Sequence, residues 1–311
     1  MDCDHSFLEL RSKQLKQKKI NNILCCLNKS ILPKELQHII IEYISTHTIH
    51  TNASLRILVR QCKSNNNYSC LKYIDTSCVT NMGFLFSSYV NFNEDISNWD
   101  VSNVVKMNDM FSGCTSFNKP LNNWNVSNVI DMYGMFMCCE SFNQPLNNWN
   151  VSSVRYMPHM FDNCINFNQN INNWDVSSVI YMYYMFCNCT SFNQPLNNWN
   201  VSKVLRMNYM FINCVEFNQP LDNWDVSSVI TMDYMFRDCR NFNQSLTCWN
   251  VKQTKYNCTM FLDCLKMQKS NKPRFSVSYF FNIKTTFLCC SKKMKINNNV
   301  KFHNFYYLFF L

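Results

Sequence analysis

The residues of this sequence with the most evident chemical potential are its cysteines, 19 in a chain of 311 residues. A thiol can serve as a nucleophile, a metal ligand or a disulfide partner. Seven of the cysteines follow one another at intervals of 25 residues: Cys114, Cys139, Cys164, Cys189, Cys214, Cys239 and Cys264. A side chain that recurs at a fixed period occupies the same structural position in successive copies. Because free cysteine is among the most buried residue types, we interpret this row as buried, reduced thiols rather than metal ligands.

The other residues that commonly carry out catalysis form no recognisable constellation. No CxxC pair and no histidine at zinc spacing accompany the cysteines, and the six histidines are scattered. With 3 glycines in the chain, a glycine-rich phosphate loop is excluded. The sequence therefore predicts a protein without enzymatic activity, metal or cofactor.

Protein binding is the chemistry that the remaining residues favour. Two columns of residues vary from copy to copy while the apolar skeleton of the repeat stays fixed. Tyrosine, which like arginine is enriched in interface hot spots, recurs in both columns, and the second also contains an arginine. One column consists of Asp109, Gly134, His159, Tyr184, Tyr209 and Tyr234, and the other of Lys106, Asp131, Tyr156, Tyr181, Arg206 and Thr231. The five tyrosines, His159 and Arg206 are the candidate partner-binding residues. Ordinary solvent-facing tyrosines on a short helix explain the same pattern.

A repeat of 25 residues positions these columns. Seven tryptophans, from Trp99 to Trp249, begin copies such as WNVSNVIDMYGMFMCCESFNQPLNN, and a degenerate first copy holds the register from Ile74. A period in the twenties with a fixed apolar skeleton is typical of a leucine-rich-repeat-like solenoid, whose coils bury their apolar faces only by stacking. We therefore expect an α/β repeat solenoid of about eight coils over residues 74–267, with the tryptophans in one buried row.

Each coil is expected to contain a short helix and a short strand. The apolar residues Met160, Phe161, Cys164 and Phe167 have the spacing of one helical face, in a helix beginning near Met157. The strand is expected close to the tryptophan, because prolines after the helix cannot donate to a ladder. A stacked column of amides that satisfies turn backbone groups is expected at Asn118, Asn143, Asn168, Asn193, Asn218 and Asn243.

The string WNVSNVxxMxxMFxxCxxFNQPLNNW resembles the BspA-like leucine-rich repeats of mycoplasma lipoproteins, other bacterial surface proteins and giant DNA viruses of protists. This resemblance spans the repeats and implies an interaction solenoid that binds a protein target and has no enzymatic activity. Surface members of the family carry a signal or lipobox, and we see no secretory signal here. The resemblance therefore favours an intracellular, virus-like member, located in the host cytoplasm if viral.

The distribution of charge argues against nucleic acid as the partner. The chain has a formal net charge of +9, but the repeats are mildly acidic and the basic surplus lies in the segments outside them. The apolar stretch 305–311 is far shorter than the roughly 20 residues of a membrane helix, so no membrane span is expected.

After a basic segment, residues 1–29, residues 30–73 are expected to form a small helical region. Its segment LPKELQHIIIEYI resembles the opening helix of an F-box, and residues 54–63 correspond to a later helix of that domain. The candidate docking residues are Leu32, Pro33, Glu35, Leu36, Ile40, Tyr43 and Ile44. The resemblance implies docking to a ubiquitin-ligase linker subunit and thus a substrate adaptor for a cullin-type ligase. The alternative is a surface or structural binding protein, adhesin-like, whose N-terminal helices only cap the solenoid.

The basic C-terminal segment, residues 268–311, has two interpretations. Residues 274–283 alternate in polarity as a strand does, and such a strand would cap the last coil. The other interpretation is a degenerate remainder of a lost repeat.

Overall fold

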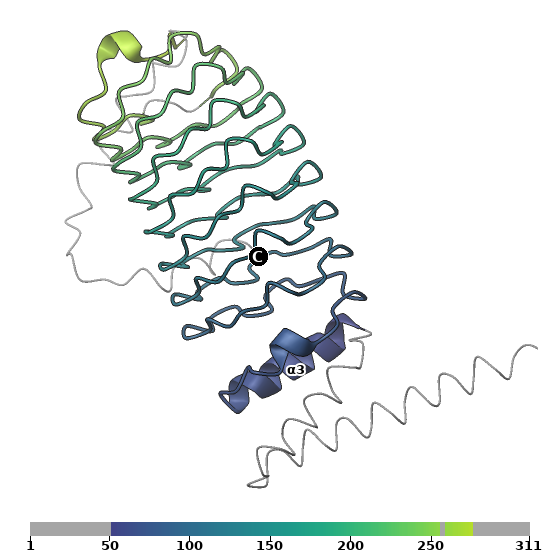
Figure 1. Cartoon of the computed structure of the whole chain (residues 1–311). Coiled ribbons are helices and arrows are strands. Elements are labelled where there is room, and N and C mark those ends of the chain that lie inside the picture. The colour runs from purple at the N-terminus through teal and green to yellow at the C-terminus, as the bar shows by residue number, and fades with distance from the viewer. Residues whose placement is uncertain (1–50, 256–258, 276–311) are drawn as a thin grey trace, which may run out of the picture. The chain divides into compact units, whose positions relative to one another are not determined.

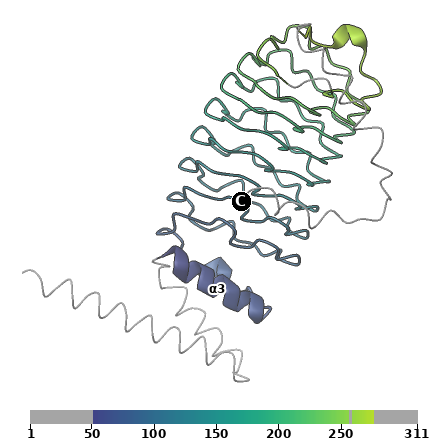
Figure 2. The same cartoon turned by 180° about the vertical axis from the view of Figure 1, so that it is seen from behind.

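The computed structural model describes residues 51–255 and 259–275. The chain divides into two units, Met1–Arg274 and Phe275–Leu311, and the features below lie in the first. Its described helices are α3 (Asn52–Ser64) and two 3-10 helices, η1 (Leu71–Tyr73) and η2 (Lys269–Asn271). Between η1 and η2 the 25-residue copies lie side by side in sequence order, as both views show (Figures 1 and 2). We call each copy a coil.

Parallel backbone hydrogen bonds join each coil to the next. Met132 N–H donates to the carbonyl of Tyr156 and Phe136 N–H to that of Met160, both at 2.9 Å. The paired segments are single-residue bridges, which run through Asn81, Lys106, Asp131, Tyr156, Tyr181, Arg206 and Thr231. The expectation of a strand beside the tryptophan is therefore wrong, because the pairing occurs farther along the coil.

The segment expected to form a short helix is built of turns instead. In the coil that begins at Trp149, Met160 N–H donates to the carbonyl of Met157, three residues back. His159 and Asn163 have φ of 56° and 60°, a left-handed conformation that interrupts a right-handed helix. Alternate backbone N–H groups donate to the next coil and so cannot pair within a helix. The helix prediction is wrong, because successive turns produce the same apolar spacing.

Rows of stacked rings fill the interior of the coils. All seven tryptophans are 2 to 4% exposed, which confirms the prediction that they are buried. The rings of Trp149 and Trp174 stack with centroids 6.2 Å apart, and Trp174 and Trp199 follow at 6.5 Å. The indole Nε1 of Trp174 donates to the carbonyl of Leu146 at 2.9 Å. This bond recurs along the row, so each buried indole N–H is satisfied.

The asparagine column is present as predicted. Asn168 Oδ1 accepts hydrogen bonds from Asn193 N–H and from Gln194 Nε2, each at 3.0 Å. Asn168 N–H in turn donates to Asn143 Oδ1 at 3.0 Å. Each amide therefore satisfies a backbone donor of the following coil, where the chain turns and has no ladder partner.

Helix α3 covers the first coil. Asn52 Oδ1 accepts from the backbone N–H groups of Thr80 and Asn81, and Arg56 Nη1 donates to the carbonyl of Gly83 at 2.7 Å. The apolar face of α3 is buried and consists of Leu55, Leu58, Val59 and Cys62. The helix therefore caps the edge that an end coil of a stack leaves open.

Candidate functional site

The structure brings the predicted partner-binding residues together in two neighbouring columns. One column is left-handed: Asp109, Gly134, His159, Tyr184, Tyr209 and Tyr234 have φ between 52° and 60°. The other is the column of parallel bridges. We call them the left-handed column and the bridge column. Residues of the two columns lie three positions apart in every coil, so the columns run side by side.

From His159 to Tyr234, the side chains of the left-handed column form a continuous stack of rings, which we call the tyrosine ladder. His159 stacks on Tyr184 with centroids 4.7 Å apart, Tyr184 on Tyr209 at 4.4 Å, and Tyr209 on Tyr234 at 5.0 Å. The guanidinium of Arg237 lies 5.7 Å from the ring of Tyr234. Three consecutive coils thus present a half-buried aromatic surface, with the buried ring of His159 at one end and the guanidinium of Arg237 at the other.

The bridge column presents its aromatic residues more openly. Tyr156 is 39% exposed, and its ring stacks on that of Tyr181 at 6.0 Å. The guanidinium of Arg206 lies 5.8 Å from the centroid of the Tyr181 ring. Exposed tyrosine and arginine side chains held by a rigid backbone ladder are typical of protein-binding surfaces.

A second left-handed column shows what the same backbone conformation accepts elsewhere in each coil. It consists of Ser88, Gly113, Cys138, Asn163, Asn188, Asn213, Asp238 and Asp263. Most of these are the small or polar residues that tolerate this conformation best. Asn188 Nδ2 donates to Asn163 Oδ1 at 3.1 Å, and Asn213 Nδ2 to Asn188 Oδ1 at 3.0 Å. In the first column, tyrosines adopt the conformation at a steric cost of roughly 1–2 kcal/mol each.

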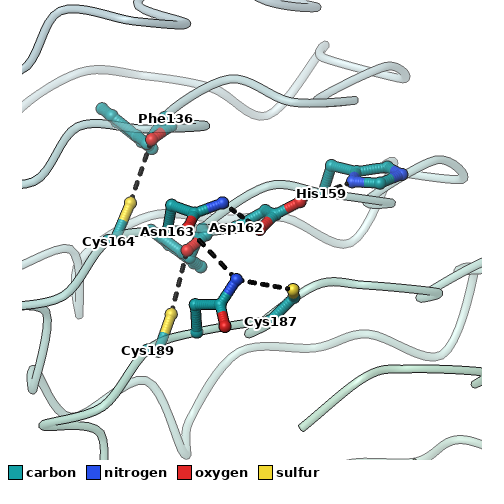
Figure 3. A network of polar contacts seen from close by, with 9 residues as sticks. Phe136, His159, Asp162, Asn163, Cys164, Cys187 and Cys189 are labelled. Atoms are coloured by element: carbon teal, nitrogen blue, oxygen red, sulfur yellow. Dashed lines mark hydrogen bonds and ion pairs between the residues drawn. The ribbon is translucent and has the colours of Figure 1, made fainter. Parts of the chain in front are cut away.

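His159 lies at the buried end of the tyrosine ladder. It is 7% exposed, so the prediction of a partner contact is wrong for this residue. Its Nδ1 lies 2.8 Å from Asp162 Oδ2, and Asp162 Oδ1 accepts from Asn163 Nδ2 at 2.7 Å (Figure 3). Burial follows because the imidazole packs between this carboxylate and the ring of Tyr184. His159 therefore anchors the ladder from inside.

The cysteine row is buried, as predicted. Cys164 Sγ donates to the carbonyl of Phe136 and Cys189 Sγ to that of Phe161, each at 2.9 Å (Figure 3). Burial raises the pKa of Cys164 and Cys189 well above the ordinary value. A thiol that is protonated and hydrogen-bonded in the interior is not an activated nucleophile. Within the described residues no three potential ligands are grouped to hold a metal.

Asp109 is a buried carboxyl group in the left-handed column. It is 7% exposed, and burial raises its pKa to about 6, against an opposing hydrogen bond from Asn108. Gly134 follows it in the next coil, where a Cβ atom would lie 2.6 Å from Asp109 Oδ1. Glycine at this position therefore leaves room for the carboxyl group, and it also accepts the local φ of 54°.

The candidate docking residues Leu32 to Ile44 lie outside the described residues. Residues 54–63, assigned to the same F-box-like region, belong to α3 and lie on the first coil. In the described part of the chain no helix has the length and hydropathy to cross a membrane.

Coils of fixed period, joined by parallel bridges and presenting variable columns, define a repeat protein. The family model described as "Mycoplasma protein of unknown function, DUF285" matches three times, at residues 53–165, 144–229 and 194–301. The overlapping matches together cover well over half of the chain, which belongs to this family. The match agrees with the resemblance to the BspA-like repeat proteins of mycoplasma. Comparisons with curated proteins and with solved structures gave no match.

Proposed function

We propose that this chain is a non-enzymatic interaction protein, a leucine-rich-repeat-like solenoid that binds a protein target through its left-handed and bridge columns. The repeated family match and the ladder of backbone bonds between coils support a repeat scaffold. Such a scaffold fixes the columns in space, so that a partner meets them without ordering a flexible loop.

The conformation of the tyrosine ladder is the observation that carries this proposal. Tyr184, Tyr209 and Tyr234 adopt a backbone conformation that favours glycine or asparagine, and the second left-handed column of the same coils contains three asparagines. Strained residues of this kind cluster at functional sites. Tyrosine also supplies a large contact area at a low cost in conformational entropy. The strain is therefore explained if the rings contact a partner.

The adaptor hypothesis is a finer form of this proposal. It requires residues 32–44 to dock to a ubiquitin-ligase linker subunit while the columns hold the substrate. The buried face of α3 instead favours a capping role for the part of the F-box-like region next to the coils. A surface or structural binding protein whose N-terminal helices only cap is thus the second candidate.

The proposal is tested by comparing the proteins captured from cell extract by the full chain and by the double variant Tyr184→Asn with Tyr209→Asn. Asparagine accepts the left-handed conformation, so the variant is expected to melt within a few degrees of the wild type. A partner that uses the ladder should bind at least about tenfold more weakly, as expected when interface hot spots are removed.

The matched control is Asn188→Gly with Asn213→Gly, which changes two left-handed residues of the other column. This control should retain every partner. Recovery of the same proteins by the wild type and the tyrosine variant, with equal affinity, would rule out the ladder as the binding surface.

A further inference from the structure

A depression opens on the bridge column beside the tyrosine ladder. It has a volume of about 340 Å³ and is lined by Asn108, Asp131, Tyr133, Tyr156, Pro158, Tyr181 and Tyr183. Four of the seven lining residues are tyrosines, which come from three consecutive coils. A hollow of this composition can take a single side chain of a bound partner.

The rings of the depression are set at different angles. Tyr156 and Tyr181 are stacked with 25° between their planes, whereas Tyr183 is tilted by 56° from Tyr181. The face of an aromatic ring carries partial negative charge and attracts cations. Arg206 illustrates this attraction, because its guanidinium lies over the Tyr181 ring at 5.8 Å.

A carboxylate stands on the other side of the aromatic pair. The bridge column runs from Asp131 through Tyr156 and Tyr181 to Arg206, one residue per coil. Asp131 therefore lies one coil before Tyr156, on the side opposite to Tyr181. Its Oδ1 accepts from Tyr133 N–H at 3.0 Å, which fixes the orientation of the carboxylate.

This carboxylate has no basic partner among the described residues. The ion pairs within 4.0 Å in that part of the chain are His159–Asp162 and Arg237–Asp238. Lys106, the neighbour of Asp131 in the bridge column, is exposed and forms none with it. The charge of Asp131 also contributes to the raised pKa of the nearby Asp109. A cation in the depression would relieve this repulsion between carboxylates.

We propose that the depression binds a basic side chain, lysine or arginine, of the protein partner, held between the carboxylate of Asp131 and the ring of Tyr156. The inference rests on the proposed function and names the chemistry that one part of that surface recognises. An apolar side chain would desolvate the carboxylate without compensation, and an acidic one would be repelled.

The inference is tested with blocked amino acids as probes of the full chain. N-acetyl-lysine amide, N-acetyl-arginine amide, N-acetyl-norleucine amide and N-acetyl-glutamate amide are titrated separately, and the ring signals of labelled tyrosines are followed by NMR. Norleucine has an apolar side chain of similar length to that of lysine but without its charge. The lysine and arginine probes should shift the signals of Tyr156 and Tyr133 saturably, with an affinity at least about fivefold above that of norleucine.

The decisive variant is Asp131→Asn, which should weaken the lysine and arginine probes by about fivefold or more. Asparagine keeps the turn, because Asn81 Oδ1 accepts Gly83 N–H at 2.9 Å at the equivalent position of the first coil. The control is Asp225→Asn, where the exposed carboxylate accepts Ser227 N–H at 3.0 Å in a similar turn. This control should leave binding unchanged.

Equal affinities for lysine and norleucine, tighter binding of glutamate, or no effect of Asp131→Asn would each overturn the inference. None of these results would overturn the proposed function, which is tested by partner capture with the Tyr184 and Tyr209 variant. A different result would contradict the proposed function: the double variant of Tyr184 and Tyr209 would capture the same partners as the wild type, with equal affinity.

Discussion

The ring of Tyr184 lies almost parallel to that of Tyr209, 7° apart in plane and 4.4 Å between centroids, although both residues have left-handed backbones. Two opposing effects meet at this pair. The backbone conformation is unfavourable for a bulky residue by roughly 1–2 kcal/mol. Stacked rings recover about 0.5–1.5 kcal/mol beyond the area that they bury. The ladder is therefore close to neutral for stability, and its rings are available for another role.

Two substitutions of Tyr209 should separate these effects. Tyr209→Asn loses the stack but removes the strain, so we expect the free energy of unfolding to change by less than about 1 kcal/mol. Tyr209→Ile loses the stack and places a β-branched residue at φ 60°, so we expect a loss of about 2 kcal/mol or more. Urea unfolding measures both. Tyr156→Ile, at a bridge position that suits β-branched residues, is the control and should be tolerated.

Asp109 should make the stability of the protein depend on pH. Its pKa is about 6 in the folded chain and its ordinary value is 3.8, so the folded state binds the proton more tightly. The stabilisation by the protonated form is complete below pH 3.8 and is lost as the pH rises through 6. This difference in pKa corresponds to about 3 kcal/mol at most.

Asp109→Asn should therefore raise the melting temperature at pH 7.5, by an amount equivalent to about 1–3 kcal/mol, and change it little at pH 4. Asparagine also suits the φ of 52° at this position. The control is Asp225→Asn, because hydrogen bonds from Ser227 lower the pKa of Asp225. It should give no stabilisation at pH 7.5. An equal gain from Asp109→Asn at both pH values would contradict the assignment.

The burial of the tryptophan and cysteine rows and the amide column was predictable from sequence, because a strict period forces equivalent positions to stack. The local backbone was not predictable in the same way. The apolar spacing of Met160, Phe161 and Cys164 suits a helix and a series of turns alike. The left-handed residues that decide between the two include Tyr184 and Tyr209, and tyrosine gives no sequence signal for that conformation. The surface columns were found from their variation, whereas the burial of His159 depends on Asp162 and could not be deduced.

The cysteine row should resist alkylation in the native protein. Burial raises the pKa of Cys114 to about 12, and that of Cys164 well above the ordinary value, so neither forms an appreciable amount of thiolate near neutral pH. Cys78 and Cys248 are exposed. N-ethylmaleimide at pH 7.5 followed by mass spectrometry should label these two and leave the row unlabelled until urea is added. A Cys164–Cys189 disulfide in freshly isolated protein would disprove the prediction that the row is reduced.

The amide column should tolerate loss of its donor but not of its acceptor. Asn168→Ala removes the oxygen that accepts from Asn193 N–H and Gln194 Nε2, and should reduce the free energy of unfolding by about 1–3 kcal/mol. Asn168→Asp keeps an acceptor at the same place and should cost clearly less at pH 7. Chemical unfolding of the two variants gives the comparison, and equal losses would mean that side-chain packing, rather than the hydrogen bonds, is responsible.

The last prediction concerns the two parts of the N-terminal region. Leu55 of α3 is fully buried against the first coil, so Leu55→Asp should destabilise the coils, since a buried charge without a partner costs several kcal/mol. The adaptor hypothesis predicts a different result for Ile40→Asp: unchanged melting of the coils and loss of capture of the ubiquitin-ligase linker subunit from host extract. Melting and capture are measured on the full chain for both variants. If Ile40→Asp melts like Leu55→Asp and the wild type captures no ligase component, residues 30–63 act only as a cap.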